Sequence, residues 1–293
     1  MDAGATSGRL GLAALVAACA AMLVTGLVVS ADAASSRAPG DDLLPDLVVQ
    51  RPSELYLADG GKEIRLRVSN TVANQGTGPL EIVGGDASDS CNLPGKPRGR
   101  LTLQNIFEDT PDDASEGYFD RDTEGDEPAR DENAGCSRYH PSHDHWHFDN
   151  FARYTLFDDK TGARVGGSRK VSFCVIDTGR PFADLPGSPE LSYYPQDPEH
   201  PKFPTCSETS VDGLSIGWED TYGASLPGQG IKVTGLRRGT YCLTIETDPV
   251  TGPSDDDGVL LEQDEGNNTR WVRLRMRPHK GVVNRLGPNC KSV

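Results

Sequence analysis

Apolar and polar residues alternate along several short segments of the chain, which is the pattern of a β-strand with one buried and one solvated face. The sequence Ile-Arg-Leu-Arg-Val at 64–68 is the clearest case. Similar β-type runs recur at 47–49, 80–83, 151–157, 171–176, 231–233, 241–245 and 271–275. Glycine and proline turn signals separate them, and no segment after residue 34 has helical periodicity over about ten residues. We therefore predict an all-β fold, an antiparallel β-sandwich with long irregular loops.

Two stretches lack this pattern. The segment 108–132 is dominated by Asp and Glu, and we expect a solvated loop there rather than core. The segment 181–204 is rich in proline with scattered Tyr and Phe, and we expect an irregular excursion over the surface. Long loops on a sandwich often border a functional site, so both stretches could lie beside one.

The first 34 residues have the features of a secretory signal peptide. Arg9 precedes an almost uninterrupted apolar run from Leu10 to Val29, and Ala31-Asp32-Ala33 fits a small-x-small cleavage site. We predict that 1–34 are removed, that 35–44 form a flexible N-terminal segment and that 45–293 form one domain. The mature protein is then expected to be secreted, with no stable membrane insertion after cleavage.

The charge balance narrows the classes of partner. The chain has 44 Asp and Glu residues against 29 Lys and Arg residues, a formal net charge of −15. Nucleic-acid binding needs a concentrated basic face, so we predict no nucleic-acid partner. The acidity suits a cationic substrate, although solubility alone explains it equally well.

Six cysteines remain once the predicted signal peptide is removed. An even number in an exported chain indicates three disulfides, and none of the six has the CxxC spacing of a zinc or thioredoxin site. The simplest arrangement pairs neighbours in the sequence: Cys91 with Cys136, Cys174 with Cys206, and Cys242 with Cys290. We therefore expect a sandwich stapled by disulfides.

Four of the six histidines fall within eight residues, at positions 140, 143, 145 and 147. His143, His145 and His147 follow a period of two, so an extended segment points all three rings to one face. The outer two Cα atoms would lie roughly 13 Å apart, so one ion can gather the three rings only if the segment bends. Three neutral imidazoles suit Cu(II) or Zn(II). His140 lies outside the period, and we expect it near the surface or behind the ligands.

Four segments together resemble the lysyl oxidase family, the copper amine oxidases that deaminate peptidyl lysine. They occur in the family's order and span roughly Pro45 to Met276, which makes 45–293 the expected catalytic domain. The segments are His143-x-His145-x-His147 followed by Phe151-x-x-Tyr154, then Lys170-Val171-Ser172-Phe173-Cys174-x-x-Asp177-Thr178, then Asp220-Thr221-Tyr222-Gly223-Ala224, and finally Glu262-x-Asp264-x-x-Asn267-Asn268.

The resemblance implies copper on His143, His145 and His147. It also implies a self-derived lysyl tyrosylquinone, with Lys170 and Tyr222 as its precursors. Enzymes of this kind convert primary amines and O₂ to aldehydes, ammonia and H₂O₂, while the protein orients the substrate and the cofactor carries the electrons.

Two positions limit what can be carried over. Asp220 shares a strand face with Tyr222 and is a candidate catalytic base, but a turn-capping Asp would look the same. Arg153 stands where animal members of the family carry a histidine, so no role of that histidine transfers. The stretch 181–204 resembles an insertion relative to the family, so the family's substrate preference does not transfer.

The last motif also resembles the family's calcium site. Side-chain oxygens spaced closely along the chain suit a hard cation, although the same residues commonly form a polar turn. The set that the resemblance implies comprises Asp46, Leu47, Glu262, Asp264, Asn267 and Asn268.

Two other functions are compatible with parts of the sequence. A non-enzymatic adhesion-type sandwich would explain two segments, Val68-Ser69-Asn70-x-x-x-Asn74-Gln75-Gly76 and Glu262-x-Asp264-x-x-Asn267-Asn268. It has no use for three period-two histidines. A zinc hydrolase would use the histidines but not Tyr222. Sequence alone names neither the natural amine nor the oligomeric state.

Overall fold

The computed structural model describes residues 42–92, 99–109, 117–121, 128–141, 144–168, 172–195, 206–207, 210–250 and 258–291. All of these belong to one compact unit, Pro39–Val293. The predicted signal peptide, 1–34, lies outside the described residues. In the part of the chain that is described, no helix has the length and apolarity needed to cross a membrane.

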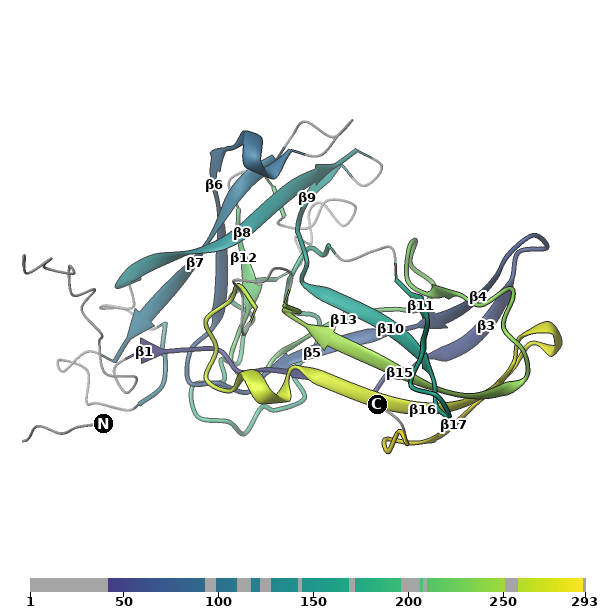
Figure 1. Ribbon diagram of the computed structural model, residues 1–293. Helices are drawn as coiled ribbons and strands as arrows, with labels where there is room; N and C mark the ends of the chain where they lie inside the picture. Colours follow the sequence, from purple (N-terminus) through teal and green to yellow (C-terminus); the bar gives the residue numbers. More distant parts are fainter. Residues whose placement is uncertain are drawn as a thin grey trace, which may run out of the picture. The chain divides into compact units, whose positions relative to one another are not determined.

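Antiparallel β-sheet makes up nearly all of the regular secondary structure of the described residues (Figure 1). One layer is a five-stranded sheet in the order β11 (Arg164–Gly167), β10 (Ala152–Asp158), β15 (Gly239–Thr247), β16 (Thr269–Arg277) and β17 (Val282–Gly287). The facing layer consists of two three-stranded sheets: β13 (Glu219–Tyr222), β5 (Asn70–Asn74) and β2 (Leu47–Val49), and β14 (Ile231–Lys232), β4 (Ile64–Val68) and β3 (Leu55–Asp59). β15 and β16 contact β2, and β17 contacts β3, so the predicted sandwich is confirmed.

The sandwich core follows from the alternation in the sequence. In β4, Ile64, Leu66 and Val68 are buried while the two arginines between them are partly exposed. Leu156 of β10 and Leu243 of β15 meet these side chains in one hydrophobic cluster and are fully buried. Each such side chain contributes about 1.5–3 kcal/mol by leaving water, so the interlayer contact is the main stabilising element.

A further antiparallel sheet carries the histidine-rich segment. Its path is β12 (Val211–Leu214), β6 (Leu80–Ala87), β7 (Gly99–Glu108), β8 (Arg130–His140) and β9 (His145–Phe148), with β1 (Asp42–Leu43) paired to β7. Three short 3₁₀ turns complete the structure: η1 (Asp89–Cys91), η2 (Glu265–Asn267) and η3 (Pro278–Lys280).

Three predictions of local structure need correction. The run 171–176 forms no strand over its described residues 172–176, where only isolated bridges occur. The acidic stretch 108–132 is not all solvated loop, because Phe119 is fully buried and its ring lies 4.5 Å from that of Phe107. The stretch 181–204 is irregular over 181–195 as expected, but it places Tyr194 in the interior.

The three predicted disulfides are confirmed: Cys91–Cys136, Cys174–Cys206 and Cys242–Cys290. The second is important for the site because it joins the segment after residue 171 to Cys206. The backbone oxygen of Cys206 in turn accepts a hydrogen bond from Trp146 N of β9, 2.8 Å long.

The interlayer core predicts that a buried and an exposed leucine differ in their contribution to the free energy of unfolding. Leu243→Ala removes a fully buried side chain and should lower the free energy of unfolding by about 2–5 kcal/mol. Leu191→Ala, at a side chain that is 81% exposed, should change it by less than about 0.5 kcal/mol. Urea denaturation of both variants measures the difference, and equal effects would contradict this account of the core.

Candidate functional site

The β8–β9 hairpin brings histidines together. His140 ends β8 and is paired with His145 at the start of β9, while His147 lies opposite Arg138. The ring centroid of His147 lies 4.8 Å from that of His145 and 5.0 Å from that of His140. His147 is buried, with 2% of its surface exposed. His143 lies outside the described residues.

The geometry of the two β9 histidines suits one metal ion. His145 Nε2 and His147 Nε2 are 2.8 Å apart. Imidazole–metal bonds measure about 2.0–2.1 Å, so both nitrogens can bind one ion with an angle of about 90° between them. Without an ion, the same pair can share one proton as a hydrogen bond. The donor set is therefore compatible with copper or zinc.

A second contact orients the ring of His147. Its Nδ1 lies 3.4 Å from Ser172 Oγ. A partner at Nδ1 fixes ring orientation and leaves Nε2 free to face a metal, the common arrangement around metal-binding histidines.

Three consecutive residues connect this pair to Tyr222. Ser172 reaches His147, as described, and the backbone of Phe173 exchanges hydrogen bonds of 2.8 and 2.9 Å with that of Phe148 in β9. The next residue, Cys174, donates its N–H to Tyr222 Oη over 2.7 Å and accepts a short hydrogen bond from the same hydroxyl. The segment thus ties the histidine strand to the tyrosine of β13.

Tyr222 lies in an aromatic and acidic environment. Its ring packs edge-on against Phe173, with centroids 4.5 Å apart. Burial raises the pKa of Tyr222 well above its ordinary value, and the negative charge of Asp220 raises it further. The phenol is therefore neutral at physiological pH, consistent with its donation of a hydrogen bond to Cys174 O.

Asp220 lies where the strand periodicity predicts, on β13 two residues before Tyr222. Only 2% of its surface is exposed. Its charge also adds to the effect of burial in raising the pKa of Tyr154, a buried residue of β10. A carboxylate therefore lies close to both phenols.

Two further residues singled out by the sequence analysis are Lys170 and Arg153. Lys170 lies outside the described residues. Arg153 is described: its guanidinium donates to both carboxylate oxygens of Glu246 at 2.9 and 3.0 Å on the five-stranded sheet. This ion pair links β10 to β15.

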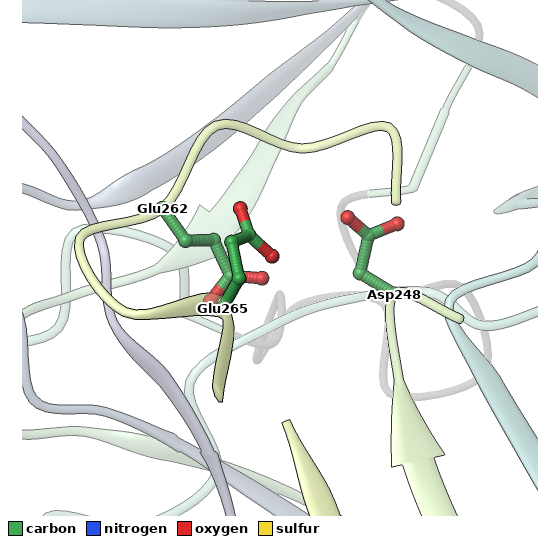
Figure 2. Close-up of side chains that lie close together, drawn as sticks. All are labelled: Asp248, Glu262 and Glu265. Carbon is green, nitrogen blue, oxygen red and sulfur yellow. The ribbon is translucent and has the colours of Figure 1, made fainter. Parts of the chain in front are cut away.

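A separate acidic cluster lies beside β2. Carboxylate oxygens of Asp248, Glu262 and Glu265 approach within 4.8 Å of one another, and Figure 2 shows the three side chains around one space. Burial raises the pKa of Glu262 well above its ordinary value, and the charges of Glu265 and Asp248 add to the shift. A bound cation would offset this repulsion.

The predicted calcium residues surround this cluster. Leu47 N donates to Glu262 Oε2 at 2.7 Å, Asn267 Nδ2 donates to Asp46 Oδ1 at 2.7 Å, and Asn268 Nδ2 donates to Glu262 Oε1 at 3.0 Å. The side-chain oxygens of Asn267 and Asn268 are buried and have no hydrogen-bond partner among the described residues. Such oxygens suit a hard cation.

Asp264 has a different role within the same segment. Its Oδ1 accepts a hydrogen bond of 2.8 Å from Gly266 N and caps the turn η2. The pKa of Asp46 is raised mainly by burial of Asp46 itself, and the negative charge of Asp264 raises it further. The residue is therefore near the predicted cation site, with one carboxylate oxygen engaged by the turn.

His140, expected near the surface or behind the ligands, has its ring beside that of His147. Sequence reasoning missed two residues of the acidic cluster. Glu265 lies within the motif, while Asp248 directly follows β15. Only the acidic run at 262–265 carried a local signal for Glu265, and no local signal marked Asp248.

Comparisons with known proteins agree with the motifs. The chain is 34% identical to protein-lysine 6-oxidase of Homo sapiens over 164 residues, 52% of this chain and 34% of that protein. It is 31% identical to lysyl oxidase homolog 1 of Homo sapiens over 156 residues, 53% of this chain and 22% of that protein. Protein-lysine 6-oxidase of Sus scrofa is 30% identical over 164 residues, 52% of this chain and 56% of that protein.

The resemblance to lysyl oxidases is therefore confirmed over about half of the chain. The matched part covers between 22% and 56% of the length of these relatives. No family model matches the chain.

The bonds at Tyr222 predict a stability effect that needs no metal. Tyr222→Phe leaves the backbone groups of Cys174 without their partner, which should lower the free energy of unfolding by about 1–3 kcal/mol. Urea denaturation of the metal-free protein measures the change. Tyr56→Phe, at a tyrosine that is 39% exposed, is the matched control and should have almost no effect. Equal stability of the two variants would contradict the bonding described for Tyr222.

Proposed function

We propose that this chain is a secreted copper-dependent amine oxidase. It would oxidise primary amines, peptidyl lysine or related compounds, to aldehydes with O₂ as the electron acceptor, releasing ammonia and H₂O₂. Support comes from the names of the relatives that it matches over half its length, and from the motifs in the same order. The alternative, a non-enzymatic metal-binding adhesion module, gives no reason for the tyrosine described next.

One observation carries the proposal. The segment 172–174 joins a histidine pair with nitrogens 2.8 Å apart to a buried tyrosine hydroxyl. A redox-active ion and an oxidisable phenol need to be held near each other for a self-derived quinone. A structural tyrosine or a plain metal site would need no such connection.

The proposed roles of the residues follow from their chemistry. His143, His145 and His147 would hold copper, and Lys170 with Tyr222 would form the lysyl tyrosylquinone. When formed, the quinone supplies the electron sink for amine oxidation. Lys170 must lose its proton to join the ring, which burial or nearby positive charge would favour.

The chain's own groups would then control protons and water. Asp220, beside Tyr222, is the proposed base for the proton on the carbon next to the amine. Phe173 packs against the Tyr222 ring and would limit access of water on that side. Ser172 would keep the ring of His147 in one orientation.

We also propose that the acidic cluster binds calcium. The proposed ligands are the backbone or side chains of Asp46, Leu47, Glu262, Asp264, Asn267 and Asn268. The structure adds Asp248 and Glu265 to the groups near enough to contribute charge. An ion here would fasten β2, the first strand of the sandwich, to the turn before β16.

Copper loading in air tests the proposed oxidase. The loaded protein should show a visible quinone band, form a coloured adduct with phenylhydrazine and produce H₂O₂ from primary amines. Lys170→Ala should still bind copper but form no adduct, because the ring then lacks its amine partner.

The other functions predict different outcomes. Copper binding without colour or adduct would favour the adhesion module. Hydrolytic activity with zinc that persists in Tyr222→Phe would favour a metal hydrolase. Full amine oxidase activity in Lys170→Ala would contradict the assignment of that lysine.

Calcium should stabilise the protein by mass action. At a free concentration of one hundred times the dissociation constant, calcium should raise the free energy of unfolding by about 2.7 kcal/mol. Glu262→Gln removes a buried charge that contacts Leu47 N and should abolish most of this increase. Asp131→Asn, at an exposed position of β8, should keep it. Thermal unfolding with calcium or a chelator measures the effect, and no calcium dependence in the wild type would refute the site.

A further inference from the structure

A small cavity lies against Phe173, the residue that packs on Tyr222. Its volume is about 20 Å³, which is enough for one water molecule or a group of similar size. Trp146 and Phe148 of β9 form part of its wall, together with Phe173 and Val175. Because side chains alternate along a strand, these two β9 residues face away from His145 and His147. The cavity is therefore distinct from the histidine cluster but adjoins the same strand.

One carboxylate, that of Asp212, lines this cavity. Strand pairing sets its position: Asp212 lies opposite Ile82 of β6, and the next residue, Gly213, donates its N–H to Val175 O over 3.0 Å. A side chain at Gly213 would clash with Leu80 O, 2.0 Å from the position of a Cβ. Glycine therefore lets β12 lie close enough to put Asp212 at the cavity wall.

The surroundings of Asp212 favour a cation. Its Oδ1 accepts a hydrogen bond of 2.9 Å from Ser210 Oγ. Burial raises the pKa of Asp212 to about 7, so the ionised form lacks the stabilisation that water would give.

Arg100 of β7 is the second ionisable group that lines the cavity, and Tyr222 of β13 packs against the wall residue Phe173. Arg100 donates its Nε–H to Gly85 O at 2.7 Å, and its guanidinium carbon lies 5.8 Å from the centre of the Trp146 ring. The charge of Asp212 contributes to the raised pKa of Tyr222, which places the carboxylate within electrostatic range of the phenol.

We propose that Asp212, with Trp146, Phe148 and Phe173, receives the primary ammonium group of the substrate and accepts its proton. In this step an N–H bond breaks, its electron pair stays on nitrogen, and an O–H bond forms on Asp212. Nothing is oxidised or reduced. The uncharged amine is then a nucleophile beside Phe173 and Tyr222. The later reaction of that amine at Tyr222 rests on the proposed oxidase function, whereas binding of the ammonium group at Asp212 does not.

In this assignment the two carboxylates accept different protons, Asp220 from the substrate carbon and Asp212 from the substrate nitrogen. Asp220 is enclosed beside Tyr222 and Tyr154, whereas Asp212 lines a space that a small group can occupy. A base whose pKa lies near neutrality accepts a proton efficiently without being protonated in advance. Asp212 therefore acts on the substrate nitrogen before any chemistry at carbon.

Binding of n-butylammonium to the copper-free protein tests the proposal without the cofactor. Isothermal titration calorimetry at pH 8 should show saturable binding in the wild type and at least tenfold weaker binding in Asp212→Asn. Asp86→Asn, an exposed carboxylate of β6 in the same sheet, is the control and should bind like the wild type. Equal affinity in Asp212→Asn, or preferential binding of acetate through Arg100, would overturn the proposal.

The pH dependence of the wild type provides a measurement that needs no variant. Butylammonium keeps its charge throughout the neutral range, as a lysine side chain does, and the raised pKa of Tyr222 keeps that phenol neutral there. Affinity should be constant above about pH 7 and fall about tenfold per pH unit below it, as Asp212 gains a proton. An affinity that is constant from pH 5 to 8 would contradict the role of Asp212.

Phenylhydrazine labelling separates this inference from the proposed function. If copper-loaded protein forms no adduct but butylammonium binding still depends on Asp212, the receiving site stands and the oxidase proposal fails. If Asp212→Asn forms the adduct and oxidises butylamine at the wild-type rate, the oxidase stands and the receiving site is wrong. If it forms the adduct but loses at least tenfold in amine oxidation, both are supported.

Discussion

The hydrogen bonds made by the backbone of 172–174 are the interaction on which the site depends. This short segment belongs to no sheet, so its backbone N–H and C=O groups are paired individually. The backbone of Phe173 bonds to that of Phe148, and the backbone of Cys174 bonds to the hydroxyl of Tyr222. Buried backbone groups rarely remain unpaired, which makes each of these bonds a constraint on position. The Cys174–Cys206 disulfide adds a covalent restraint to the same segment. The histidine strand and the tyrosine are therefore placed by one connection.

The same segment shows where sequence reasoning succeeds and where it fails. Alternation predicted β2 and β4 because each has one buried face, and the period of two is visible locally. The run 171–176 is equally apolar, but its described residues bond to three different elements, which no local pattern reveals. The burial of Phe119 was not predicted for a related reason, because a single buried ring in an acidic stretch produces no periodic pattern. Likewise, the approach of His140 to His147 depends on the register of a hairpin.

Buried carboxylates give the site its electrostatic character. Burial raises the pKa of both Glu262 and Asp212, and each lies where a positively charged ligand is proposed. A chain with a net charge of −15 can hold such groups only at a cost, because their neighbours repel them as well. Sequence motifs located Glu262 but not Asp212 or Asp248, whose partners lie far away along the chain. The proposed calcium and substrate sites thus share one feature, a buried carboxylate whose negative charge a bound cation would offset.

In the proposed function, the histidine cluster and Tyr222 form one centre in which bound copper converts the tyrosine. Peptide mass spectrometry after aerobic copper loading is the direct test. We expect a cross-linked product that contains both Lys170 and Tyr222, formed only with copper and lost in His147→Ala. Separate, unmodified peptides for the two residues in protein that has bound copper stoichiometrically would refute this function.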